Sequence, residues 1–323
     1  MIRRVLALGL GIWLWGSVPV RAWWWGESGT ETVQVLQKRY EVKDYAAVIS
    51  GLYPDGLQRL RGKSLRRGYI LLAASYENVG RLERSMALYQ VAARLFPEDH
   101  DVIARLGQFL QRRGMSEQAK PLYEKILKME PDDPYAHLGL AEIYRDLGFL
   151  DRSADHYEQA LRSLADQGGV WQQYAELLYA LREYRTAELA LRRAEELGLR
   201  NEDLQTDFAL VWRALGRYDE ALAALEPQVR AGKLAALRAR ALWLMEAGRE
   251  REAQSAVAAV LRVSASDPLA LYVRARLHLK AGRKQSARED LLAVARSDNS
   301  PFTAQVCAEL AALLDGVQVR VKP

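Results

Sequence analysis

Apolar side chains recur along this chain with the spacing of α-helices. From residue 66 onwards they fall at every third or fourth position, and short polar turns separate one apolar stretch from the next. This period places the apolar groups on one face of each helix. No continuous run of β-branched residues alternates with polar ones, as the strands of a sheet would. The pattern predicts an all-α chain.

Glycines punctuate the helical stretches at a regular interval. The spacing is 34 residues or a multiple of 34, except for one interval of 32, and Arg182 stands where one glycine is missing. A tight turn between two helices favours positive φ, which glycine adopts without a steric penalty. The glycines are Gly80, Gly114, Gly148, Gly216, Gly248 and Gly282. We therefore expect repeated pairs of helices, with one turn rebuilt at Arg182.

Small residues recur in the same register. The repeats are counted from Arg66, His100, Pro134, Gly168, Glu202, Leu234 and Pro268. The eighth place is always Ala or Gly: Ala73, Gly107, Ala141, Ala175, Ala209, Ala241 and Ala275. The twentieth place never exceeds Ser: Ser85, Ala119, Ser153, Ala187, Ala221, Ala253 and Ala287. Two antiparallel helices approach closely only where facing side chains are small, so these places predict the contact within each pair.

The period, the small residues and the repeat-closing Pro97 and Pro131 resemble the tetratricopeptide repeat (TPR) family. The resemblance covers seven units over about residues 66–298 and is looser in later units, where Arg240 and Arg274 take an apolar place. It implies a right-handed superhelical α-solenoid of helix-turn-helix repeats. Because each unit of a solenoid contacts only its neighbours, we expect one elongated domain.

The ends of the array are expected to differ from its middle, because one face of each terminal unit meets water. Residues 30–65 predict a degenerate capping repeat with helices over 32–40 and 45–52. Residues 299–314 predict a C-terminal capping helix, and residues 315–323 a flexible tail. Within the array, Pro227 falls in a second helix and the next unit arrives two residues early, which predicts a local break in the superhelix at about 226–234.

The N-terminus has the pattern of an export signal. Arg3 and Arg4 precede an apolar run over 5–20, and Val20-Arg21-Ala22 supplies small residues at a cleavage site. We expect residues 1–22 to be a cleaved signal peptide and the protein to be periplasmic. The alternative is an uncleaved inner-membrane anchor that extends to about residue 25 and faces the periplasm. Tryptophans favour the membrane interface, so this alternative includes a membrane contact through Trp23, Trp24 and Trp25.

The net charge limits the classes of partner, and the cysteine count limits the disulfides. Removal of the three arginines of the leader would reduce the formal net charge from +5 to +2. Such near balance argues against nucleic acid as a partner. The single cysteine, Cys307, cannot form an intramolecular disulfide, and we expect it to be buried and inert.

No set of residues predicts catalysis or a cofactor. The histidines have neither the close pairs nor the Cys/His spacing of a metal site, and the acidic residues follow helix-surface spacing beside arginines. Gly168-Gly169 lacks the strand, spacing and lysine of a phosphate loop. The histidines are His100, His137, His156 and His278. We expect no enzyme activity, no cofactor and no metal.

The resemblance implies a binding groove on the concave face, lined by places two, five, nine, twelve and thirteen of the first helices. The central units supply Asp101, Gln108, Arg112, Tyr135, Glu142, Arg145, Gln172, Glu176 and Tyr179. Such a mixture suits an extended peptide or a partner helix. The lysine and asparagines with which chaperone-binding members grip a terminal carboxylate are absent at the corresponding places, such as Ile70 and Ala74.

These features together predict a non-catalytic periplasmic scaffold that binds a protein or peptide segment in its groove. Its expected setting is the assembly of a cell-envelope complex, such as a pilus, a secretion or polysaccharide-export system, or a cytochrome-maturation complex. The alternatives are an inner-membrane-anchored adaptor that recruits a partner, and an accessory subunit of an envelope enzyme. The fold itself names no partner.

Overall fold

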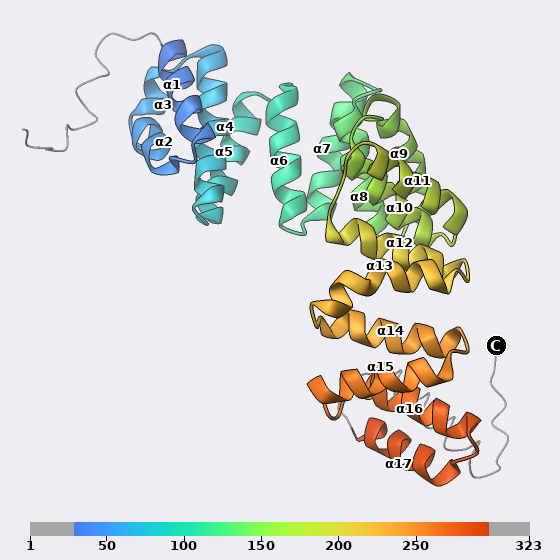
Figure 1. The fold of residues 1–323 in the computed structure, drawn as a ribbon. Helices are drawn as coiled ribbons and strands as arrows, with labels where there is room; N and C mark the ends of the chain where they lie inside the picture. The colour runs from blue at the N-terminus through green and yellow to red at the C-terminus, as the bar shows by residue number, and fades with distance from the viewer. Residues whose placement is uncertain (1–28, 297–323) are drawn as a thin grey trace, which may run out of the picture. The chain divides into compact units, whose positions relative to one another are not determined.

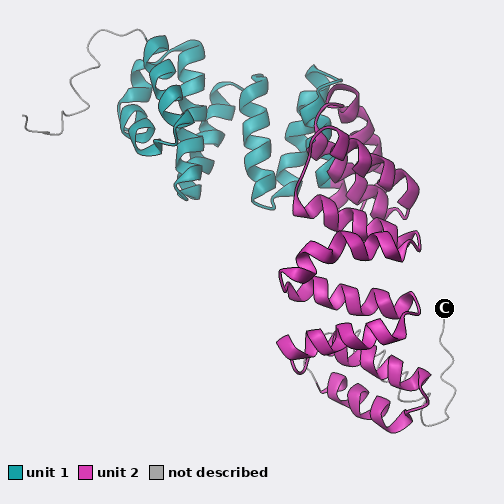
Figure 2. Cartoon of the chain, viewed as in Figure 1, with its two compact units in different colours: residues 1–143 teal, residues 144–323 magenta. Residues whose placement is uncertain are grey.

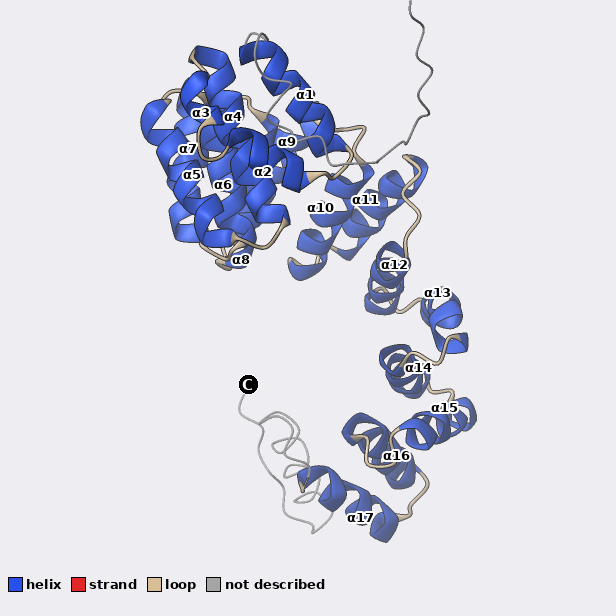
Figure 3. Cartoon of the chain, turned by 90° about the vertical axis from the view of Figure 1, so that its left-hand side faces the viewer, coloured by secondary structure: helices blue, strands red, loops and turns tan. Residues whose placement is uncertain are grey.

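The structure, a computed structural model, describes residues 29–296, and every regular element in that range is a helix (Figure 3). The N-terminal part consists of α1 (Gly29–Glu41), α2 (Tyr45–Leu52) and α3 (Gly56–Arg59). Fourteen helices follow: α4 (Gly62–Asn78), α5 (Leu82–Leu95), α6 (His100–Arg112), α7 (Ser116–Met129), α8 (Pro134–Asp146), α9 (Leu150–Ser163), α10 (Gly168–Ala180), α11 (Tyr184–Glu196), α12 (Glu202–Ala214), α13 (Tyr218–Arg230), α14 (Leu234–Glu246), α15 (Glu250–Val263), α16 (Pro268–Lys280) and α17 (Lys284–Ala295) (Figure 1).

The even-numbered helices from α4 to α16 are the first helices of seven repeats, and the odd-numbered helices are the second. Six of the seven first helices begin at the residue from which the sequence register was counted, and α4 begins earlier, at Gly62. Several predicted features lie outside the described residues: the signal peptide or anchor, Trp23 to Trp25, the closing helix with Cys307, and the tail. Within residues 29–296, no helix is both long and apolar enough to cross a membrane.

Residues 1–143 and 144–323 form two compact units, here called unit 1 and unit 2 (Figure 2). The boundary falls inside α8. The sequence pattern predicted one array without such a division, because neighbouring repeats share the same register. The two units are described separately below.

Unit 1 begins with the predicted capping helices. Their apolar side chains form a core with α4, in which Leu52 and Leu72 are fully buried. The Asp44 carboxylate accepts the N–H of Ala47 at 3.2 Å and so caps α2. Burial of this face against α4 attaches a short and otherwise marginal helix pair to the first repeat.

The turns within the repeats have the conformation that the glycine period predicts. The six repeat glycines have φ between 70° and 81°. Arg182 has φ of 64°, and it makes the same two bonds as they do: its N–H reaches the Tyr179 carbonyl at 3.0 Å, and the Glu183 N–H reaches the Leu178 carbonyl at 2.8 Å. The prediction that Arg182 rebuilds this turn without glycine is therefore confirmed.

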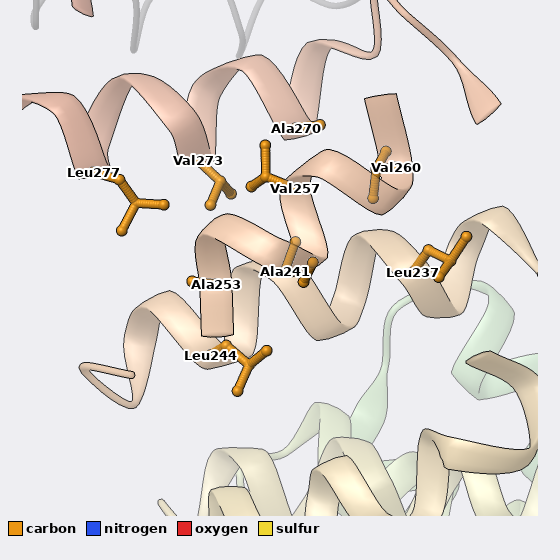
Figure 4. Packing of buried hydrophobic residues seen from close by; sticks show 10 residues of the cluster. Leu237, Ala241, Leu244, Ala253, Val257, Val260, Ala270, Val273 and Leu277 are labelled. Atoms are coloured by element: carbon orange, nitrogen blue, oxygen red, sulfur yellow. The ribbon is translucent and has the colours of Figure 1, made fainter. Parts of the chain in front are cut away.

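The small residues lie in the core, where each first helix meets its second helix. Every residue at place eight or twenty is buried. Figure 4 shows one example in unit 2, where Ala241 of α14 and Ala253 of α15 lie among Leu244 and Val257, with Val273 of α16 behind them. Alanine lets the two helix backbones approach, and the larger neighbours fill the remaining space at interior density.

Pro227 does not break its own helix, and the predicted local break in the superhelix over 226–234 stays a prediction. Helix α13 runs through Pro227 without interruption, and the carbonyl of Pro227 accepts the N–H of Ala231 at 3.0 Å. The helix ends at Arg230, and Gly232 turns the chain with φ of 71° before α14 begins. Pro227 is exposed, so its ring projects from the outer side of the helix and only the local backbone bond is lost.

Candidate partner-binding surface

Three pairs of neighbouring first helices contact one another directly, α4 with α6 in unit 1, and α10 with α12 and α14 with α16 in unit 2, whereas the contact of α12 with α14 is weaker. Contacts between successive second helices are weaker. The first helices therefore form the closer-packed layer in each unit. We call the surface of this layer the first-helix face, and all nine predicted groove residues belong to first helices.

In unit 1 the charged residues of this face are tied to neighbouring repeats. The guanidinium of Arg112 donates from Nε and Nη2 to the two carboxylate oxygens of Glu77, at 3.0 and 3.1 Å. Asp101 Oδ2 lies 3.4 Å from Nη2 of Arg66. Such bidentate and paired contacts hold consecutive first helices together.

Glu142 belongs to a polar network inside unit 1. One of its carboxylate oxygens accepts a hydrogen bond from the Gln111 amide, whose oxygen in turn accepts the Tyr123 hydroxyl at 2.9 Å. Desolvation, followed by the charge of Glu142, raises the pKa of Tyr123, so its phenol stays protonated as the donor. Gln108 is half-buried and Tyr135 is exposed on the same face.

In unit 2, Arg145 of α8 reaches the next first helix. Its Nη1 lies 3.5 Å from Glu176 Oε2 and 3.4 Å from the hydroxyl of Tyr157. Tyr179 is half-buried, and its ring packs against Tyr184 with centroids 5.4 Å apart. Arg145, Gln172, Glu176 and Tyr179 therefore share the first-helix face of unit 2.

Two further acidic residues join Gln172 and Glu176 from α12. The Gln172 amide donates to Asp207 Oδ2 at 2.6 Å, and Gln172 is itself buried. Asp203 lies one turn before Asp207 on α12 and acts electrostatically on both Glu176 and Asp207. We call Glu176, Asp203 and Asp207 the acidic cluster.

The surroundings of Asp207 and Glu176 disfavour the ionised forms of these two carboxyls. Burial, with the charges of Glu176 and Asp203, raises the pKa of Asp207 from its ordinary 3.8 to about 6, against the opposing effect of the Gln172 hydrogen bond. Burial also raises the pKa of Glu176, which Arg145 lowers and Asp203 raises.

The acidic cluster differs from the other links between first helices. Arg213 and Glu246 form a bidentate pair at 2.8 and 2.7 Å, like Arg112 and Glu77, so charge is balanced at each of those seams. In the cluster, Arg145 pairs with Glu176 alone among the three carboxylates. An unbalanced, partly buried group of this kind is typical of a functional site.

The sequence missed two members of the cluster. Asp203 takes place two of its repeat, which is one of the five groove places, but it lies beyond the central units that were considered. Asp207 takes place six, which is not a groove place. Its nearness to Gln172 depends on how α10 and α12 stack, and a repeat register does not contain that information.

The structure places most histidines in packing roles. His156 stacks on Tyr144 with ring centroids 5.4 Å apart, and His137 Nε2 lies 3.0 Å from the carbonyl oxygen of Pro131. Burial and the charges of Arg283 and Arg274 lower the pKa of His278, against the opposing effect of Asp290.

Comparison with known protein families matches two descriptions. "Tetratricopeptide repeat" matches residues 105–168 and 238–302, and "YpiA-like, C-terminal tetratricopeptide repeats" matches residues 70–133. A human relative, Tetratricopeptide repeat protein 7B, is 28% identical over 117 residues. That segment covers 36% of this chain and 14% of the human protein.

Solved structures share the fold. A tetratricopeptide repeat protein from Parabacteroides merdae superposes with a TM-score of 0.55 at 18% identity, over 77% of this chain and 98% of that one. PilW, described as a widely conserved type IV pilus biogenesis factor, gives 0.53 at 20% identity, over 64% of this chain and 97% of that one. The helix pairs, the positive-φ turns and the buried small residues agree with these matches, and the chain belongs to the tetratricopeptide repeat family.

Proposed function

We propose that this protein is a non-catalytic adaptor whose first-helix face in unit 2 binds a basic segment of a partner protein. TPR proteins bind protein or peptide partners, so an interaction role follows from the family. The observation that carries the choice of site is the grouping of Asp207 with Glu176 and Asp203, beside the buried Gln172 whose amide donates to Asp207 Oδ2 at 2.6 Å.

The chemistry of the cluster favours an arginine or lysine of the partner. A cation beside Asp207 would favour its ionised form and lower its pKa, so binding would release a proton at about pH 6 and below. Gln172 already fixes one oxygen of Asp207, which leaves the other as an acceptor. Tyr179, half-buried on the same face, offers an aromatic surface to the rest of the segment.

We also propose that the adaptor works outside the inner membrane, in the assembly of a cell-envelope complex. The support is the N-terminal pattern of Arg3, Arg4 and the apolar run over 5–20. Pilus assembly is one setting to test, alongside secretion, polysaccharide export and cytochrome maturation.

The mature N-terminus distinguishes the cleaved form from the anchored alternative. Sequencing of the purified protein from cells should give Trp23 as the first residue if the leader is removed. An intact N-terminus in the membrane fraction would instead support an adaptor held by residues 5–25. A stoichiometric complex with an enzyme would favour the accessory-subunit alternative.

Charge reversal tests the binding site. The double variant Glu176→Lys with Asp203→Lys should lose the partner that the parent captures from cross-linked envelope fractions, because the cluster would become basic. Asp151→Lys with Glu196→Lys is the matched control, since both carboxylates are exposed on second helices of the same unit. Equal loss in both variants, or retention in the first, would contradict the site.

A further inference from the structure

Three potential metal ligands meet where the second repeat joins the third, inside unit 1. His100 begins α6, Glu130 follows the end of α7, and Asp133 immediately precedes α8. His100 Nε2 lies 2.9 Å from Asp133 Oδ2. One ligand atom from each of the three side chains lies within 4.8 Å of the others. The spacing of residues along the chain did not indicate this group, because about one repeat separates His100 from the two acids.

We call the junction between two consecutive repeats a seam. The seam between the first and second repeats shows what is unusual at the seam with His100. The residues 34 positions earlier are Arg66, Phe96 and Asp99, and Arg66 Nη1 lies 2.6 Å from Asp99 Oδ2. That seam therefore holds a guanidinium, a carboxylate and an apolar ring. At the next seam an imidazole replaces the guanidinium and Glu130 replaces the ring. A permanent cation is lost and a carboxylate is gained.

A neutral imidazole has a lone pair to offer, which a guanidinium has not. The seam with His100 thus combines one nitrogen and two carboxylate ligands with a deficit of positive charge. The seam that pairs Glu202 with Lys233 also contains its own cation, with the order of the charges reversed. A bound divalent cation would supply at His100 the positive charge that Arg66 and Lys233 supply at their seams.

The ligands are already oriented. Asp133 Oδ1 accepts the N–H of Ala136 at 2.6 Å, which fixes the carboxylate and leaves Oδ2 toward His100. The Asp133 side chain is 9% exposed and that of His100 33%, so solvent reaches the group from one side. Water can therefore complete a coordination sphere, as it does at zinc sites with three protein ligands.

We propose that His100, Glu130 and Asp133 bind a divalent transition-metal cation of the zinc class. Zinc bonds of about 2.0–2.2 Å to nitrogen and oxygen place neighbouring ligand atoms about 3.5 Å apart, which small side-chain rotations reach from the present spacing. The imidazole disfavours Mg²⁺ and Ca²⁺, which prefer oxygen ligands. The ion would join α6 to the turn between α7 and α8 and so stabilise unit 1.

Calorimetric titration of the metal-stripped full chain with ZnCl₂ tests the site. We expect one ion per chain for the parent and no heat from MgCl₂ at equal concentration. His100→Arg and Glu130→Gln should each weaken zinc binding by about tenfold or more, since even outer-shell changes have effects of that size. Glu124→Gln, an exposed carboxylate on α7, is the matched control and should bind like the parent.

His100→Arg also separates metal binding from folding, because it recreates the pair that Arg66 makes with Asp99. Its circular dichroism and melting temperature without zinc should match the parent. Zinc should raise the melting temperature of the parent and of Glu124→Gln, but not that of His100→Arg. Absence of zinc binding to the parent, or equal binding by all variants, would overturn the proposal. Neither result would affect the proposed role of unit 2.

Discussion

Single residues carry identifiable tasks in this chain, and Arg182 is an instructive one. It occupies a left-handed turn that glycine fills in the other repeats, with φ of 64°. That conformation costs an L-residue about 1 kcal/mol, yet the turn keeps both of its hydrogen bonds. The repeat context therefore overrides the local preference of one residue.

Tyr123 shows how tightly neighbouring residues depend on one another. A Cβ added to Gly139 would lie 2.5 Å from Tyr123 Cζ, and one added to Gly107 would lie 3.2 Å from it. The period predicts small residues at place eight, which includes Gly107. It does not single out Gly139 at place six, because that requirement comes from the large ring of one particular repeat.

Asp207 should destabilise the native protein at neutral pH. The pKa of its carboxyl is about 6 in the folded protein, above the ordinary 3.8. The contribution of this carboxyl to stability is therefore fully present below about pH 3.8 and is lost as the pH rises through 6. Asp207→Asn keeps an acceptor for Gln172 and removes the charge. We expect it to raise the free energy of unfolding by about 1 kcal/mol at pH 7, after allowance for solvent screening.

Urea denaturation of parent and Asp207→Asn at pH 7 and pH 4 provides the measurement. The gain should shrink strongly at pH 4, where the folded carboxyl is protonated and the unfolded one is about half ionised. A variant that is less stable than the parent at pH 7 would show that the charge of Asp207 is satisfied within the protein.

At the scale of elements, the sequence predicted most of the helices and turns because their determinants are local and repeat. The first helices start where the register places them, and the small residues at places eight and twenty are all buried. The continuity of α13 at Pro227 has a physical cause. A proline on the exposed side of a packed helix removes one backbone bond, while the buried Ala221 and Leu225 keep the helix in place.

Pro227→Ala should therefore stabilise α13. The new N–H can donate to the carbonyl four residues earlier, and alanine favours the helix, so we expect a gain of about 1–2 kcal/mol. The urea midpoint and the helical circular dichroism signal measure it. A loss of stability would indicate that the proline shapes the turn over Ala231 to Lys233.

At the scale of the whole molecule, the nine predicted groove residues divide between the two units, with Arg145, Gln172, Glu176 and Tyr179 in unit 2. Repeat spacing placed them on the first helices, and their role in a groove stays a prediction. It could not predict which side chains pair across repeats, as Arg112 does with Glu77, because pairing depends on side-chain reach between helices. The balance of charge that remains after pairing identifies the acidic cluster.

Site-specific photo-crosslinking tests the central claim most directly. Benzoylphenylalanine in place of Tyr179, on the first-helix face beside the cluster, should capture the partner in living cells. The same probe in place of Leu189, which is 67% exposed on the second helix α11, should not. Capture at position 179 alone, through a segment rich in arginine or lysine, is the predicted result. Capture at position 189 without capture at 179 would contradict binding on the first-helix face.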